Sequence, residues 1–194
     1  MQHLPSVLYG KRELLERMPP FLGGGGMIHS VWVDRFEPAS LGDSDDPRPA
    51  RFEAGTPPIV PAIGLSAAID YLERVGLDAI HRHERFLTDR AHRLLQAVPG
   101  LRILGPGLEA KGGIVSFVLA DEDLRPIHGH DVAERLDRHG IAVRASHHCA
   151  EPLHRRYGLD ATVRASFYFY NTPEEVDLLG EALQETRHAF QRRK

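Results

Sequence analysis

The alternation of apolar and polar positions predicts helices and strands over most of the chain. Apolar residues recur at helical spacing over residues 59–75 and 78–97, while shorter apolar runs are typical of strands. The expected helices cover residues 11–18, 59–75, 78–97, 131–139, 151–157 and a last stretch that starts after Thr172. The expected strands cover residues 27–33, 101–104, 114–119, 141–144 and 163–168. This order predicts an α/β domain with a small sheet covered by helices.

The first 58 residues fit that domain poorly. Val7, Leu8 and Tyr9 are typical of the end of a buried strand, and a run of four glycines follows at residues 23–26. Residues 34–50 are polar and rich in proline, which predicts a long loop. We therefore expect two parts, residues 1–58 and residues 59–194.

Composition and charge narrow the classes of function. The chain has 194 residues, of which 24 are basic and 27 acidic, for a net charge of −3. Such a balance gives no electrostatic support for a nucleic-acid partner. No apolar run is long enough for a membrane span, and residues 1–5 lack the layout of a signal peptide. A single cysteine cannot form an internal disulfide, so a cytoplasmic location is the expectation.

That cysteine, Cys149, is the first candidate for chemistry. It follows His147 and His148 in a predicted loop, with Arg144 upstream and a short predicted helix downstream. Histidines, an arginine and a helix start all favour the thiolate, which is the nucleophilic form. The alternative is a small buried side chain, because free cysteine is among the most buried residues.

The same stretch raises the question of a metal site. His147, His148, Cys149 and His154 are of the types that bind zinc. Three consecutive residues rarely point at one ion, however, and the stretch has no spaced ligand pair. We therefore expect no metal.

Two further positions are candidates for binding. Arg164 lies in a strand-like apolar run, where its guanidinium could bind a carboxylate at two points or form a structural ion pair. Thr56 follows Gly55 just before a predicted helix, a place where a hydroxyl and backbone amides can bind phosphate. On its own, the second motif is equally typical of a simple turn.

Together these stretches resemble the C-terminal half of group II (SUF-type) cysteine desulfurases, in the class V aminotransferase superfamily. The resemblance covers nearly the whole chain and follows the family's order. Its stretches are Leu8-Tyr9-Gly10-Lys11, Arg51-Phe52-Glu53-Ala54-Gly55-Thr56-Pro57, His130-Asp131-Val132, Gly140-Ile141-Ala142-Val143-Arg144, His147-His148-Cys149-Ala150 and Arg164-Ala165-Ser166. It implies the small C-terminal domain of a fold-type I enzyme plus a trailing segment of the large domain.

The resemblance also implies a reaction. In this family pyridoxal 5′-phosphate condenses with L-cysteine, and an enzyme cysteine attacks the substrate sulfur, leaving a persulfide and releasing alanine. The position of the nucleophile is matched by Cys149, and that of the arginine that binds the substrate carboxylate by Arg164. Arg144 would lie beside the same pocket, His147 and His148 would support the thiol loop, and Thr56 matches a residue that reaches the cofactor phosphate of the opposite subunit.

The family's partners follow from the same resemblance. It implies a homodimer that passes sulfur to an acceptor protein for iron–sulfur cluster assembly. It does not implicate nucleic acid, membrane or metal.

Two features depart from the family pattern. The lysine that holds the cofactor, and the Gly-Pro-Thr-Gly segment after it, have no counterpart here, since Lys11 and Lys111 match no catalytic position. The family also has glycine where this chain has Ser146, which would strain the loop if that position requires a positive φ.

Several interpretations therefore stay open. The chain could be an inactive part of a cysteine desulfurase, whether a fragment, a truncated gene product or one half of a split enzyme. It could be a non-catalytic sulfur-relay or partner-binding remnant that presents Cys149. It could also belong to a selenocysteine lyase or another class V relative.

Overall fold

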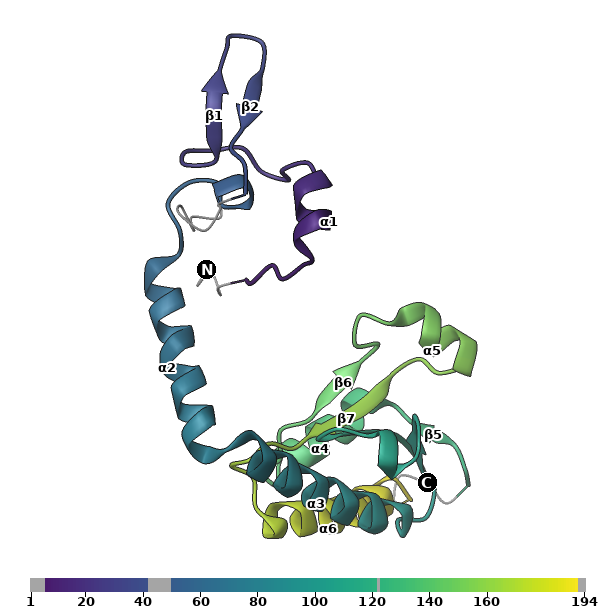
Figure 1. Cartoon of the computed structure of the whole chain (residues 1–194). Coiled ribbons are helices and arrows are strands. Elements are labelled where there is room, and N and C mark those ends of the chain that lie inside the picture. Colours follow the sequence, from purple (N-terminus) through teal and green to yellow (C-terminus); the bar gives the residue numbers. More distant parts are fainter. Residues whose placement is uncertain (1–5, 42–49, 122, 192–194) are drawn as a thin grey trace. The chain divides into compact units, whose positions relative to one another are not determined.

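The computed structural model describes residues 6–41, 50–121 and 123–191 (Figure 1). The chain separates into two compact units, Met1–Arg74 and Val75–Lys194, and each is considered by itself. The boundary lies at the end of the helix over residues 59–75, whereas the sequence analysis places its boundary before this helix. The expected boundary concerns the family's domains and stays a prediction.

The second unit is built on an antiparallel sheet. Its strands run in the order β3-β4-β7-β6, and a short additional strand, β5, pairs with β4. The strands are β3 (Leu101–Leu104), β4 (Ile114–Ala120), β5 (Pro126–Ile127), β6 (Arg144–Ser146) and β7 (Thr162–Ser166). Along β4, Val115, Phe117 and Leu119 are buried while the residues between them are not. One face of the sheet is therefore packed and the other is open to further groups.

Three helices form the packed side: α3 (Leu77–Gln96), α4 (Gly129–Asp137) and α6 (Pro173–Gln191). Both α3 and α4 contact the sheet, and α6 packs against these two helices (Figure 1). The largest core side chains are Leu87, Leu95, Val98, Val115, Phe117, Leu119, Val132, Leu136, Val163, Val176 and Leu183. Leu87 and Leu95 on α3 and Val176 and Leu183 on α6 are among the apolar positions that helical spacing predicts for the core.

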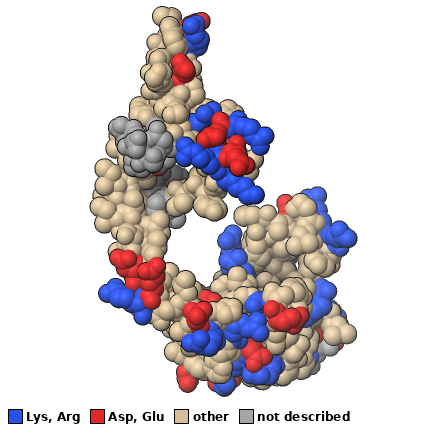
Figure 2. All heavy atoms as spheres, viewed as in Figure 1, with Lys and Arg blue, Asp and Glu red and all other residues tan. Residues whose placement is uncertain are grey.

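Polar contacts fix the helical layer from outside. Arg90 on α3 donates two hydrogen bonds of 2.6 Å to the carboxylate of Asp177 on α6. At the start of α6 the Glu175 amide donates to the Thr172 hydroxyl, and the Thr172 amide donates to the Glu175 carboxylate. Figure 2 shows basic and acidic side chains intermingled over the visible face of this layer.

The first unit has little burial. Its elements are α1 (Arg12–Arg17), β1 (Ile28–Val31), β2 (Phe36–Pro38), η1 (Ala50–Phe52) and α2 (Ile59–Val75). No residue of α2 is buried, and large apolar side chains are exposed, with Tyr9 at 95%, Phe21 at 90% and Val60 at 80% of their surface. The apolar surface of this unit is therefore uncovered in the described chain.

Several element predictions are confirmed and others are wrong. The helices over residues 59–75 and 151–157 and the strand over residues 101–104 have the predicted bounds. The strand expected at residues 141–144 is instead β6, three residues further on. Ile141 and Val143 pack against the core from an irregular segment, so their burial does not require strand pairing. The helix expected to start at Asp131 starts at Gly129 and is capped by the His128 side chain.

Some elements were not expected from the sequence. Both β2 and η1 lie in or at the edge of the predicted loop over residues 34–50, and β5 is a two-residue strand. Positions 42–49 of that loop, the first five residues and Lys194 lie outside the described residues. Among the described helices, none is both long and apolar enough to cross a lipid bilayer.

Candidate active site

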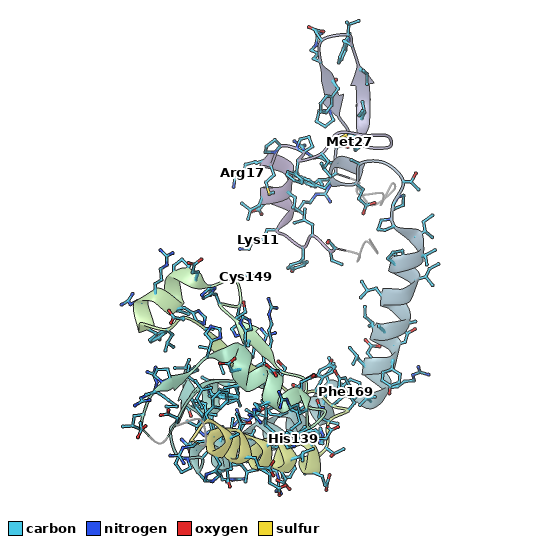
Figure 3. The ribbon with its side chains drawn as sticks, turned by 180° about the vertical axis from the view of Figure 1, so that it is seen from behind. Lys11, Arg17, Met27, His139, Cys149 and Phe169 are labelled. Atoms are coloured by element: carbon cyan, nitrogen blue, oxygen red, sulfur yellow. The ribbon has the colours of Figure 1, made fainter. Side chains whose placement is uncertain are left out.

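Cys149 lies in the tight turn that joins β6 to α5 (Glu151–Tyr157) (Figure 3). The Ala150 amide donates to the His147 carbonyl at 2.8 Å, and φ is 52° at His148 and 60° at Cys149. Positive φ at both central positions is typical of a type I′ turn, and each such non-glycine residue costs about 1 to 3 kcal/mol. The thiol is exposed. The turn thus presents the single cysteine to solvent on a strained backbone.

Residues on both sides of Cys149 are fastened to Thr162, the first residue of β7. The His148 Nε2–H donates to the Thr162 carbonyl at 3.2 Å. The His154 Nδ1–H donates to the Ala150 carbonyl at 3.0 Å, and its Nε2 lies 3.0 Å from the Thr162 hydroxyl oxygen. A carbonyl only accepts, so the hydrogen of a neutral His154 is on Nδ1 and its Nε2 accepts the hydroxyl proton.

The surroundings of His148 disfavour its protonated form. Its Nδ1 is buried without a hydrogen-bond partner, so a proton placed there would have no acceptor. Burial lowers the pKa of His148 below the ordinary value of 6.5, and the nearby positive charges of Arg164 and Arg144 lower it further. The backbone hydrogen bond to Thr162 acts in the opposite direction but does not outweigh these effects.

Arg144 and Arg164 lie directly opposite each other across the β6–β7 pair. Opposed residues of antiparallel strands project to the same face of a sheet, where two like charges are unfavourable. Neither arginine forms an ion pair with any described residue, and the Nε of Arg164 is buried without a partner. The interpretation of Arg164 as a structural ion pair is therefore wrong within the described part of the chain. Two adjacent guanidinium groups with no acidic partner among the described residues can bind an anion.

A cavity of about 410 Å³ opens beside this pair, lined by residues of the sheet and of α5, on the sheet face opposite α3, α4 and α6. Its polar lining includes Arg164, His148 and Lys111, and its walls are mostly apolar. Those apolar walls are formed by Leu104, Pro106, Ala110, Ile114, Leu153, Tyr157 and Leu159. No carboxylate is among the cavity's lining residues. The cavity therefore suits a small anion with an uncharged body.

Lys111 is a cavity residue that sequence reasoning missed. Its amine donates to the Leu104 carbonyl at 2.8 Å, and burial lowers its pKa from 10.5. Lys111 lies in the glycine-rich connection before β4, a segment whose sequence gives no helical or strand signal. Lys111 reaches the cavity because that connection folds back onto β3. The rarity of lysine in this chain is the only sequence signal that singles out Lys111.

The remaining predicted residues are placed as follows. His147 stacks edge to face on His154, with ring centroids 5.5 Å apart. Thr56 is exposed in the first unit, directly after Gly55 with its φ of 85°. Ser146 lies in β6 and has no positive φ, so the condition under which it would strain the loop is not met. The positive φ values of this loop are at His148 and Cys149 instead. In the described residues no group of histidine, cysteine and acidic side chains is arranged for a metal ion.

Comparison with known proteins places the chain in a family. The model of the family described as aminotransferase class-V matches residues 6–179. A probable cysteine desulfurase of Streptomyces coelicolor is 51% identical over 95% of the chain and 42% of its own length. One from Staphylococcus aureus is 47% identical with the same coverage.

Solved structures give the same result. An apo cysteine desulfurase from Thermococcus onnurineus superposes with a TM-score of 0.81 at 40% identity, and the S-sulfonic acid form of the cysteine desulfurase CsdA from Escherichia coli with 0.80 at 36%. Both similarities cover 93% of this chain and 42% of the solved one. The chain thus spans less than half the length of the relatives it matches.

Proposed function

Because the chain belongs to the aminotransferase class-V family, we propose that it is the thiol-bearing part of a cysteine desulfurase that uses pyridoxal 5′-phosphate. Its substrate is L-cysteine, and its products are L-alanine and a persulfide on Cys149. The observation that carries this proposal is the combination of an exposed thiol with two arginines on one edge of the sheet that have no acidic partner in the described part of the chain. An amino-acid substrate brings the missing carboxylate.

Arg164 binds that carboxylate. Its guanidinium offers paired N–H donors in a planar fork, which fits both oxygens of a carboxylate at once. The apolar walls of the adjoining cavity strengthen this contact because they exclude competing water. Arg144, directly opposite, adds positive charge on the same face of the sheet and is placed nearer in sequence to the thiol.

Cys149 forms the new sulfur–sulfur bond. Its thiolate attacks the sulfur of the substrate as the carbon–sulfur bond of the substrate breaks, so the sulfur atom stays on the enzyme as a persulfide. Because the thiol is exposed, a sulfur-acceptor protein can reach that persulfide. Delivery for iron–sulfur cluster assembly by a homodimeric enzyme is the fate of the sulfur that we propose by analogy with the family.

The residues of this chain do not by themselves fit the cofactor. Pyridoxal phosphate sites need a lysine for the aldehyde and a charged partner for the pyridine nitrogen. The cavity of the second unit contains no carboxylate, and the amine of Lys111 is engaged with the Leu104 carbonyl. Thr56 offers a hydroxyl for the phosphate. We propose that residues 1–58 belong with a cofactor domain and that the lysine comes from the complementary part of the enzyme.

The experiment joins the chain to the complementary part of the Streptomyces coelicolor relative. We expect the chimera to release alanine from L-cysteine in the presence of pyridoxal phosphate, and Arg164→Ala to abolish this release. Folded, cofactor-loaded chimera that releases no alanine would contradict the proposal. Faster turnover of L-selenocysteine than of L-cysteine would favour a selenocysteine lyase instead. If the chimera releases no alanine but transfers sulfur from an added persulfide to an acceptor, the chain would be a sulfur relay.

A further inference from the structure

The turn that carries Cys149 has an unfavourable backbone, so something must hold it. Both His148 and Cys149 have positive φ without being glycine, and the turn has one internal backbone hydrogen bond, from Ala150 to His147. The Ala150 carbonyl also accepts the backbone amides of Leu153 and His154 at 3.1 Å each, which fixes the end of the turn but not His148 and Cys149. Such conformations persist where the surrounding structure over-determines them. The side chains that contact the turn are therefore the place to look for the restraint.

Thr162 supplies a restraint on each side of the thiol. Its carbonyl accepts from His148, the residue before Cys149, and its hydroxyl reaches Ala150, the residue after Cys149, through the His154 ring. His154 is 7% exposed and Thr162 is 3% exposed. The hydrogen bond between them is buried, and the one from His154 to the Ala150 carbonyl is partly buried. Loss of either partner would leave a buried polar atom unsatisfied.

We propose that His154 and Thr162 are positioning residues that clamp the Cys149 turn in its left-handed conformation. His154 does not touch the reacting atoms. It transmits the fixed position of β7 to the carbonyl of Ala150, and thereby holds the residue that follows the nucleophile. This inference uses the proposed function only in calling Cys149 the nucleophile.

The chain offers a matched set of variants. Thr162→Val removes the hydroxyl but keeps the shape and the carbonyl that binds His148, whereas Thr162→Ser retains the hydroxyl. His154→Leu removes the ring. Thr186 on α6 is the control, because it is equally buried at 2% exposure and its hydroxyl donates to the Ala182 carbonyl within that helix. Thr186→Val therefore deletes a comparable hydrogen bond away from the turn.

The measurement is amide hydrogen exchange of residues 147–150 in the full chain, with alkylation of the single thiol by iodoacetamide as a second readout. We expect Thr162→Val and His154→Leu to raise exchange in the turn about fivefold to tenfold, the effect of losing one buried hydrogen bond. The double variant should exchange only slightly faster than either single variant, because both substitutions remove the same hydrogen bond between His154 and Thr162. Thr162→Ser and Thr186→Val should leave the turn protected and its alkylation rate unchanged.

The proposal is overturned if Thr162→Val leaves exchange of the turn unchanged, or if Thr186→Val raises it equally. The first result would mean that the turn needs no clamp, and the second that any loss of stability opens it. If His154→Leu unfolds the second unit, the difference in amide exchange between Thr162→Val and Thr162→Ser still tests the proposal. No substrate or cofactor enters the assay, so its outcome is separate from that of the desulfurase experiment.

Discussion

At the scale of single residues, two neighbouring arginines have no acidic partner among the residues that the structure describes. Arg144 and Arg164 face each other across two strands although the chain holds 27 acidic residues. Elsewhere in the described chain arginines do form ion pairs with acidic residues, as Arg90 does with Asp177. Like charges opposed in this way are unfavourable, so the arrangement is explained by an anion that binds there. The substrate carboxylate is that anion in our proposal.

Replacing Arg164 tests this directly. Arg164→Lys keeps the charge but loses the two-point contact, so we expect weaker binding of L-cysteine by about 1.5 to 3 kcal/mol. In steady-state assays of the chimera this corresponds to roughly a tenfold to hundredfold higher KM. Arg144→Lys should affect the thiol step more than binding. Arg102→Lys on β3 is the control, and an unchanged KM in Arg164→Lys would contradict the assignment.

His148 makes the stability of the chain depend on pH. Burial lowers its pKa in the folded protein below the value near 6.5 that the unfolded chain has. The unfolded state therefore binds more protons below that pH, and the free energy of unfolding falls as the pH drops through the folded value. Above the unfolded value both states are neutral and His148 contributes no slope.

Chemical unfolding at several pH values between about 8 and about 5 measures this contribution. His148→Gln retains an N–H that can donate to the Thr162 carbonyl but does not titrate, so we expect a shallower loss of stability on acidification. The chain has 12 histidines, so the comparison with wild type is what isolates this one. Equal slopes in the two proteins would show that His148 does not carry the dependence.

At the scale of elements, β7 organises the site. Thr162 and Arg164 both lie on the sheet face opposite α3, α4 and α6, where both line the cavity and Thr162 also holds the thiol turn. The opposite residues of β7, Val163 and Ala165, are buried in the core. Strand alternation therefore couples the position of the site to the packing of the helices.

The pairing of β7 with β4 depends on one glycine. A side-chain carbon on Gly113 would collide with the Phe167 carbonyl, whose amide donates to the Gly113 carbonyl at 2.7 Å, whereas one on Gly112 would meet nothing. We expect Gly113→Ala to destabilise the chain by about 1 to 3 kcal/mol. Gly112→Ala should be neutral or slightly stabilising. Denaturant unfolding compares the two, and similar stabilities would contradict the predicted clash.

Many of the helices and part of the candidate site could be predicted from the sequence. The helical spacing predicted α2 and the core face of α3, and the Thr172 cap predicted the start of α6. The motif around Cys149 indicated an exposed thiol in a loop. The clamp through His154 and the cavity position of Lys111 could not be predicted, because both depend on which residues the sheet brings opposite each other. Whether Ser146 is strained could not be predicted either, because residue identity alone does not give φ.

At the scale of the whole molecule, the first unit lacks a cover for its apolar surface. The chain spans 42% of the length of its relatives, and α2 carries exposed Ile59, Val60 and Ile63 with no buried residue. An exposed apolar surface of this kind marks an interaction site or promotes aggregation. The bare chain is thus expected to lack part of what stabilises the whole enzyme.

We therefore expect the isolated chain to self-associate. Sedimentation should show oligomers whose share grows with concentration, and Val60→Gln combined with Ile63→Gln should reduce them. The substitutions remove apolar surface from an exposed helix face and should leave the core of the second unit intact. A sharp monomer at high concentration, without binding of a hydrophobic dye, would contradict this expectation.

The central claim is that Cys149 receives sulfur from L-cysteine. The most direct test is mass spectrometry of the Cys149 peptide after the chimera has turned over L-cysteine once. We predict that this peptide gains one sulfur atom, and that the gain is lost in Cys149→Ser while pyridoxal phosphate stays bound, because a hydroxyl is a far weaker nucleophile. An active chimera whose Cys149 peptide gains no sulfur, or a Cys149→Ser variant with full activity, would contradict the account.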